Sequence, residues 1–318
     1  MPPELSPAKP SKPKRSIWIA AALVVLALGA IGGCHAMSVS RAITRAEAQR
    51  PRDPKTGIRV GAEPFAHHVG EPACLLLHGF EATPQIFREM AQQFADAGIS
   101  SRVILFPGHG TTVADFAASR GADWVAAAEK AYDDMLQKHR AVYVVGFSMG
   151  GTVALHLAER RDVSGVVCLA PFLRITRKWF HLVRAESLSR LCRWLHFPRV
   201  VKNIPLDVAD VSVRPQVIHV GFTPIVTACS LFDLADQTRS GLGSITCPLL
   251  VLQGRLDRVA DPRESERLIE QVKSNPKRLI RLERSAHLLP MDYDKARVFA
   301  ETIAFIRERE AGRAARTR

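Results

Sequence analysis

The sequence predicts an α/β protein with a doubly wound, mostly parallel sheet, a small inserted cap and an N-terminal membrane segment. Three observations support this prediction. Short apolar segments alternate with amphipathic, helix-like segments from about residue 58 to residue 310. The alternation stops for about 80 residues between the apolar runs 163–170 and 248–253, which is more than a crossover needs. Near the N-terminus, residues 16–34 contain no charged side chain.

The N-terminal part divides into a polar tail (1–16), a predicted transmembrane or signal-anchor segment (17–36) and a linker (37–57). The 19 uncharged residues from Ser16 to Cys34 match the length of a helix that crosses a ~30 Å hydrocarbon core. We therefore expect a membrane-anchored protein. A single-pass anchor and a lipoprotein-like signal that ends before Cys34 fit equally well. Basic residues flank both sides of the segment, so the side of the membrane is not determined.

The net charge of +13 raises the question of a nucleic-acid partner. No nucleic-acid motif is present, and aromatic residues are not interleaved with the basic clusters at the two ends of the chain. The clusters suit an anionic membrane surface better, so we expect a membrane and no nucleic acid as partner. The sequence implies no obligate protein partner. The six cysteines form no CxxC pair, which favours buried free thiols.

Residues 58–310 are predicted as one domain, followed by a basic tail (311–318). The predicted strands are residues 74–77, 102–106, 141–145, 163–170, 248–253 and 278–282. The predicted helices are residues 84–97, 123–138, 153–158, 263–272 and 295–309. Strands that alternate with helices in this way indicate a mostly parallel sheet. The segment that interrupts this alternation is predicted to form a cap over about residues 172–232.

A G-x-S-x-G motif lies between the apolar strand 141–145 and the helix that follows it. In this context the motif is typical of a nucleophile elbow, in which Ser148 sits on a strained turn between strand and helix. Small residues at Gly146 and Gly150 would let the two backbones pass close together. Ser148 is therefore the candidate nucleophile.

A serine nucleophile needs a base, and the base needs a third group to orient it. In this type of sheet the acid and then the histidine follow the serine in the chain, each after a strand. Asp257 and His287 meet that order and are the candidate acid and base. The oxyanion that forms during acyl transfer needs two backbone donors, for which we predict the N–H groups of Met149 and Phe80.

In these residues the chain resembles the α/β-hydrolase superfamily, and within it the bacterial carboxylesterase and monoacylglycerol lipase group. The resemblance covers about residues 58–308 and rests on the segments His78-Gly79-Phe80, Pro107-Gly108-His109-Gly110 and Gly146–Gly151 together with Asp257 and His287. It implies an α/β-hydrolase fold and a serine hydrolase for carboxylic esters of lipid-like or apolar acyl groups. No organic cofactor and no metal is expected.

The chain departs from that group at Glu81, where such enzymes usually carry a small neutral residue. We expect this carboxyl to face solvent; the alternative is that it points inward, where its charge would raise the energy of a nearby oxyanion and change the rate or the substrate. Thioester hydrolysis or acyl transfer by the same triad remains an alternative, as does a non-catalytic interaction protein on a hydrolase scaffold. The motifs leave the acyl length, the physiological substrate and the oligomeric state open.

Overall fold

The computed structural model describes residues 33–34, 36–176, 185–194, 200–202 and 205–316. The chain forms two compact units, Met1–Ala46 and Glu47–Arg318. Residues 47–57, predicted as linker, thus belong to the second unit. Among the described residues, no helix has both the length and the apolar character to cross a membrane. Residues 17–32, most of the predicted membrane segment, lie outside the described part of the chain.

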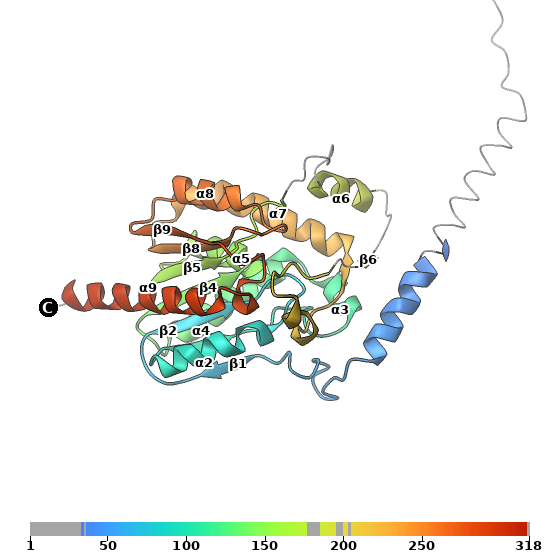
Figure 1. Ribbon diagram of the computed structural model, residues 1–318, viewed down its shortest axis with the longest axis horizontal. Helices are drawn as coiled ribbons and strands as arrows, with labels where there is room; N and C mark the ends of the chain where they lie inside the picture. The colour runs from blue at the N-terminus through green and yellow to red at the C-terminus, as the bar shows by residue number, and fades with distance from the viewer. Residues whose placement is uncertain (1–32, 35, 177–184, 195–199, 203–204, 317–318) are drawn as a thin grey trace, which may run out of the picture. The chain divides into compact units, whose positions relative to one another are not determined.

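The second unit is built on a seven-stranded sheet with the order β1-β3-β2-β4-β5-β8-β9 (Figure 1). All neighbouring strands are parallel except β1, which pairs with β3 in the antiparallel direction. The strands are β1 Phe65–His67, β2 Ala73–Leu77, β3 Ser100–Val103, β4 Val142–Phe147, β5 Gly165–Leu169, β8 Leu249–Gly254 and β9 Lys277–Leu282. The predicted mostly parallel sheet is confirmed. Every residue of β2, β4, β5 and β8 is buried, as expected for strands covered on both faces.

Helices cover both faces of the sheet. Helix α2, which follows the 3-10 turn η1, packs with α9 on one face, whereas α4, α5 and α8 cover the other (Figure 1). Their bounds are η1 Pro84–Phe87, α2 Arg88–Asp96, α4 Gly121–Leu136, α5 Met149–Ala158, α8 Pro262–Gln271 and α9 Lys295–Arg316. From β2 the chain crosses to β3 on one side, whereas β4 pairs with β2 on its other side. A ligand crevice is expected where the strand order reverses in this way.

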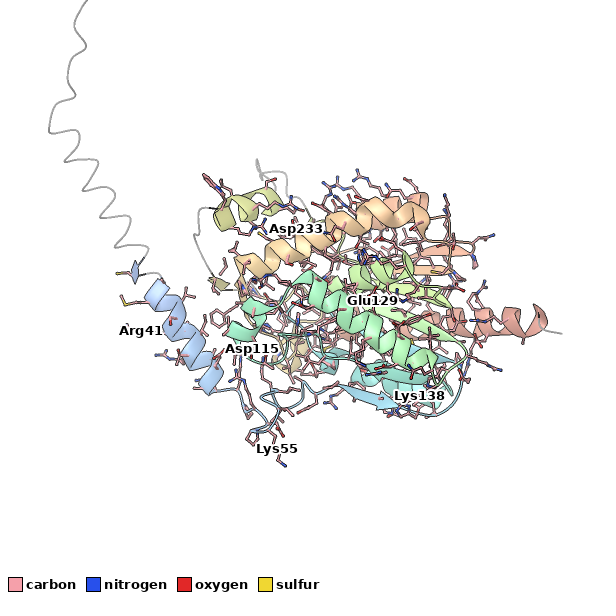
Figure 2. All side chains as sticks on the ribbon, turned by 180° about the vertical axis from the view of Figure 1, so that it is seen from behind. Arg41, Lys55, Asp115, Glu129, Lys138 and Asp233 are labelled. Carbon is pink, nitrogen blue, oxygen red and sulfur yellow. The ribbon has the colours of Figure 1, made fainter. Side chains whose placement is uncertain are left out.

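The stretch between β5 and β8 forms the cap region. Its described elements are α6 Ala185–Trp194, β6 Val200–Lys202, η2 Val211–Gln216, β7 Phe222–Pro224, α7 Ile225–Gly241 and η3 Leu242–Ser244. Helix α6 packs on α7, where Arg190 bonds both Asp233 (2.9 Å) and Asp236 (2.7 Å). Figure 2 labels Asp233 on α7 near α6. Because α7 runs unbroken to Gly241, the predicted cap boundary at residue 232 falls inside a helix.

The third strand begins and ends earlier than predicted. It covers Ser100–Val103 rather than residues 102–106, because Ser100 and Ser101 pair with the first residues of β2. Beyond Val103 the backbone leaves the sheet, and the N–H of Phe106 donates to Nε2 of His78 (3.1 Å). The short helix α3 (Val113–Ala118) and strand β1 were not predicted. Both have few residues, so hydrophobic periodicity gives little signal for either.

Candidate active site

Ser148 lies on a sharp turn between β4 and α5 with a positive φ of 53° and ψ of −116°. A non-glycine residue in such a conformation costs about 1–3 kcal/mol, which the surrounding packing must offset. The turn is possible because the flanking glycines have no side chain. A Cβ at Gly146 would lie 2.1 Å from the carbonyl oxygen of Gly150, and one at Gly150 would lie 2.0 Å from that of Leu77. Without these side chains, the turn packs closely against the carboxyl end of β2.

The structure brings Ser148, His287 and Asp257 into one hydrogen-bonded line. Nε2 of His287 lies 2.8 Å from Oγ of Ser148, and Nδ1 of His287 lies 2.8 Å from Oδ2 of Asp257. Oδ1 of Asp257 accepts bonds from the N–H groups of Val259 (2.8 Å) and Ala260 (2.9 Å). Because a carboxylate only accepts hydrogen bonds, Nδ1 carries the ring proton and Nε2 accepts from the serine hydroxyl. All three side chains are buried.

Gln253, the penultimate residue of β8, is a member of this network that sequence reasoning missed. Its Nε2 donates to Oδ2 of Asp257 (2.8 Å), and its Oε1 accepts from the hydroxyl of Ser265 on α8 (2.8 Å). Gln253 is 2% exposed. A lone polar residue at the end of the apolar run 249–252 was the available signal, because a buried amide needs partners.

The loop after β2 passes directly beside Ser148. A Cβ at Gly79 would lie 3.2 Å from Cβ of Ser148 and 2.8 Å from the ring of Phe147. Phe80 follows in this loop. Met149 is the first residue of α5, where a backbone N–H has no intrahelical acceptor. Both predicted donors thus belong to backbone segments that flank the serine.

An aromatic cluster holds this loop. The ring of Phe80 packs against Phe116 (4.9 Å between centroids) and Trp124 (5.9 Å). His78 accepts a bond from Phe106 through Nε2, so Nδ1 carries its proton and donates to the carbonyl of Gly79 (2.9 Å). Burial lowers the pKa of His78 to about 4, and therefore this histidine is neutral and structural near neutral pH.

His109 also supports the loop rather than the nucleophile. It is 1% exposed, and its Nδ1 lies 3.1 Å from the carbonyl oxygen of Pro107. Burial lowers the pKa of His109 well below its ordinary value, and the neighbouring His78 lowers it further. Its ring packs edge-on against Phe116 at 4.7 Å.

Glu81 does not face solvent, contrary to the prediction. It is 9% exposed, has a positive φ of 63°, and lines the same pocket as Ser148. Its Oε1 accepts a bond from the hydroxyl of Thr223 on β7, and its backbone carbonyl accepts from the N–H of Val220 (3.0 Å). Burial raises the pKa of Glu81 to about 7, and the bond from Thr223 opposes that rise. Tertiary packing of the cap region against this turn buries the carboxyl, which no local pattern signals.

A pocket of about 370 Å³ opens onto Ser148 and His287. Most of its wall is apolar and comes from both the sheet edge and the cap region; it includes Phe147, Phe172, Leu206, Val217, Leu231 and Phe232. The polar side chains in the wall include Glu81, Asp207, His219 and Thr223. Within the described residues, no group of three His, Cys, Asp or Glu side chains could hold a metal ion.

Comparison with known proteins places the chain among hydrolases. Residues 70–294 match the family model described as serine aminopeptidase, S33. A thermostable monoacylglycerol lipase of Bacillus sp. (strain H-257) is 30% identical over 246 residues, covering 77% of this chain and 94% of that protein. The carboxylesterase of Bacillus subtilis (strain 168) is 21% identical over 248 residues, covering 78% and 97%.

A solved structure of a metagenome-derived lipolytic enzyme has the same architecture, with a TM-score of 0.72 at 28% identity, covering 78% of this chain and 98% of that one. Sheet topology, inserted cap and elbow together define an α/β-hydrolase. The chain belongs to the S33 family of this superfamily. It is a serine hydrolase of the lipase and esterase type.

Proposed function

We propose that the protein hydrolyses carboxylic esters with lipid-like or other apolar acyl groups through an acyl-enzyme intermediate. The observation that carries this proposal is the unbroken line from Ser148 through His287 to Asp257 at the wall of a mostly apolar pocket. A serine hydroxyl bonded to a neutral imidazole is activated for attack on a carbonyl carbon. An apolar wall favours the hydrocarbon part of an ester over a charged substrate.

In this mechanism Nε2 of His287 takes the proton of Ser148 as Oγ attacks the ester carbonyl. The same imidazole then returns the proton to the leaving alcohol. A water molecule activated by His287 releases the acid from the serine. Asp257 keeps the proton of the neutral ring on Nδ1 and balances the charge of the imidazolium that forms.

The N–H groups of Phe80 and Met149 are the proposed donors to the oxyanion. Their backbone segments flank Ser148 on two sides. Loss of one such donor typically costs about 10²–10³ in kcat, so the packing of the Phe80 loop matters for rate. The aromatic cluster around Phe80 supplies that packing.

Two relatives carry the names of a lipase and an esterase. The Bacillus sp. relative is named a monoacylglycerol lipase, and the B. subtilis relative a carboxylesterase. A pocket of about 370 Å³ has room for a short to medium acyl chain. We propose such esters, including monoacylglycerols, as substrates.

We also propose that the uncharged segment Ser16–Cys34 attaches the enzyme to a membrane, either as a single-pass helix or through a lipidated Cys34. The basis is its length and lack of charge in the sequence. Mass spectrometry of the mature N-terminus distinguishes the two forms, because lipidation follows cleavage before Cys34.

Labelling with a fluorophosphonate tests the nucleophile directly. The full-length protein should be labelled at Ser148, and the Ser148→Ala variant should not. Peptide mapping identifies the modified residue. An unlabelled but folded wild-type protein would favour the non-catalytic scaffold and overturn the proposal.

A series of p-nitrophenyl esters of increasing chain length, a matched thioester and an amino-acid arylamide test the substrate class. We expect kcat/KM to be highest for esters and much lower for the arylamide, because an amine is a poorer leaving group than an alcohol or phenol. Hydrolysis of the thioester in clear preference to the ester would favour the thioesterase alternative.

A further inference from the structure

Residues 205–210, here called the strap, run from the cap region across the loop that carries His287. Val208 of the strap is 4% exposed and belongs to the hydrophobic core of the domain. Leu206 packs against the same core. The strap is therefore part of the packed body of the domain. Asp207 lies between these two apolar residues and lines the pocket that contains Ser148.

The strap binds the His287 loop on both sides of the histidine. The backbone carbonyl of Asp207 accepts bonds from the N–H groups of His287 and Leu288, both at 3.2 Å. On the other side, Oδ2 of Asp292 accepts from the N–H of Ala286 (2.8 Å) and from the N–H of Ala209 (2.9 Å) in the strap. The backbone of His287 is thus held between two attachments to one segment.

The side chain of Asp207 reaches the other loop of the proposed triad. Its Oδ2 accepts a 2.8 Å bond from the N–H of Arg258, the residue after Asp257. One strap residue therefore contacts both loops, through its carbonyl on the histidine side and its carboxyl on the acid side. The two loops follow different strands, β8 and β9, and their separation decides whether His287 and Asp257 can bond.

The carboxyl of Asp207 also contributes charge near the proposed base. Burial raises the pKa of Asp207, and the charge of Asp257 adds to the rise, whereas the bond from Arg258 and the charges of His287 and Arg258 oppose it. Asp207 from the strap and Asp257 and Arg258 from the β8 loop are the charged groups around His287, and the pocket wall adds Glu81 from the β2 loop and His219 from the cap region. Asp207 thus places a second carboxyl beside His287.

We propose that Asp207 is a positioning residue for ester hydrolysis: it holds the Asp257 and His287 loops in register, and its negative charge stabilises the protonated form of His287. This inference rests on the proposed function, because it assigns Asp207 a role through those two residues. Asp207 bonds neither of their side chains, so its effect on rate acts through their placement and charge.

Two variants of Asp207 separate the hydrogen bond from the charge. Asp207→Asn keeps an acceptor for the N–H of Arg258 but removes the charge, whereas Asp207→Ala removes both. Asp210→Asn is the matched control, since Asp210 lies in the same strap and its carboxyl bonds only locally to Ser212 (2.6 and 3.1 Å). Each variant is measured in the full-length protein for kcat and KM on a water-soluble ester from pH 5 to pH 9.

For Asp207→Ala we expect kcat to fall about tenfold with KM changed less than about twofold, because a backbone donor loses a charged acceptor. For Asp207→Asn we expect kcat at high pH to stay within about threefold of wild type. The acid limb of its pH–kcat profile should move to lower pH by about 0.5 unit. The reason is that this variant lacks the partly exposed carboxylate of Asp207, which favours the imidazolium form of His287. Asp210→Asn should match wild type in kcat and in the acid limb.

Labelling with the fluorophosphonate distinguishes failure of the proposed function from failure of the role proposed for Asp207. If wild type is neither labelled nor active on esters, the proposed function fails. If wild type is labelled and active, but both Asp207 variants match Asp210→Asn in kcat and in the acid limb, the role of Asp207 is refuted. A change in KM alone would also refute it, since that result indicates only a pocket-lining residue. Should Asp207→Ala not fold, the acid limb of Asp207→Asn decides.

Discussion

Gln253 donates a 2.8 Å hydrogen bond to Oδ2 of Asp257, the same oxygen that lies 2.8 Å from Nδ1 of His287. Two donors on one oxygen fix the direction of that carboxylate. Its other oxygen is held by the N–H groups of Val259 and Ala260. The candidate acid is therefore oriented by its own loop, by β8 and by the histidine together.

Replacing Gln253 with leucine tests this arrangement. The change removes the amide donor and leaves the hydroxyl of Ser265 without its acceptor. We expect kcat to fall about tenfold with little change in KM, because the bond to the charged carboxylate is lost. Ser265→Ala, which leaves the bond to Asp257 intact, should cost less. Equal kcat for Gln253→Leu and wild type would show that this bond does not orient Asp257.

The effects of single replacements in the proposed triad on kcat should not be additive. We expect Ser148→Ala and His287→Ala each to lower kcat by roughly 10⁴-fold or more, and the double variant to be no worse than either. Asp257→Asn should retain more activity than the other two. Unchanged melting temperatures by circular dichroism would show that these losses are chemical. Full activity of folded Ser148→Ala would exclude Ser148 as the nucleophile.

Gly150 should tolerate no side chain. A Cβ there would meet the backbone carbonyls of Leu77 at 2.0 Å and His78 at 2.7 Å, and backbone at the sheet edge has little freedom to move. We expect Gly150→Ala to lower the free energy of unfolding by about 3 kcal/mol or more. Gly243→Ala is the control, since nothing lies within 4 Å of the added atom. Urea unfolding measures both, and similar values for the two variants would contradict the close packing.

Glu81 should make stability depend on pH. Its folded pKa of about 7 exceeds the ordinary value of 4.5, so the folded chain holds this proton more tightly than the unfolded chain. The contribution of Glu81 to the free energy of unfolding is most favourable below pH 4.5. It decreases as the pH rises from 4.5 to about 7 and is constant above that pH. Glu81→Gln should therefore gain stability relative to wild type over that interval. Urea midpoints at pH 5, 6, 7 and 8 measure the difference, and a constant difference would contradict the buried, titrating carboxyl.

The start of the second unit should be needed for its stability. Arg50 donates to the carbonyl of Val220 and Arg59 to that of His219, both at 2.6 Å. A chain that starts at Glu47 keeps both contacts, and we expect it to leave the membrane fraction and cleave a soluble ester. A chain that starts at Ile58 loses Arg50 and should melt at a lower temperature.

Membrane fractionation and thermal melting of the full-length protein and the two shortened chains check this prediction. Retention of the Glu47 chain in the membrane fraction would show that the attachment is not confined to residues 1–46. Equal melting temperatures for the two shortened chains would show that Arg50 adds no stability.

The sequence by itself determined the chain order of the six parallel strands and of the helices α2, α4, α5, α8 and α9, and the context of Ser148. Buried parallel strands appear as continuous apolar runs, and the close approach of two backbones at an elbow demands glycine at Gly146 and Gly150. Chain order was enough to select Asp257 and His287, because the carboxyl ends of parallel strands meet at one edge of the sheet.

Only the tertiary structure decided the burial of Glu81 and the roles of Gln253 and Asp207 in the hydrogen-bond network. Each of these side chains is held by partners distant in sequence or by the backbone of another loop: Thr223 for Glu81, Ser265 for Gln253 and Arg258 for Asp207. The cap boundary depends in the same way on the packing of α7 against α4, α5 and α6. Periodicity and spacing describe a segment alone, whereas the environment of a polar side chain depends on which segments pack together.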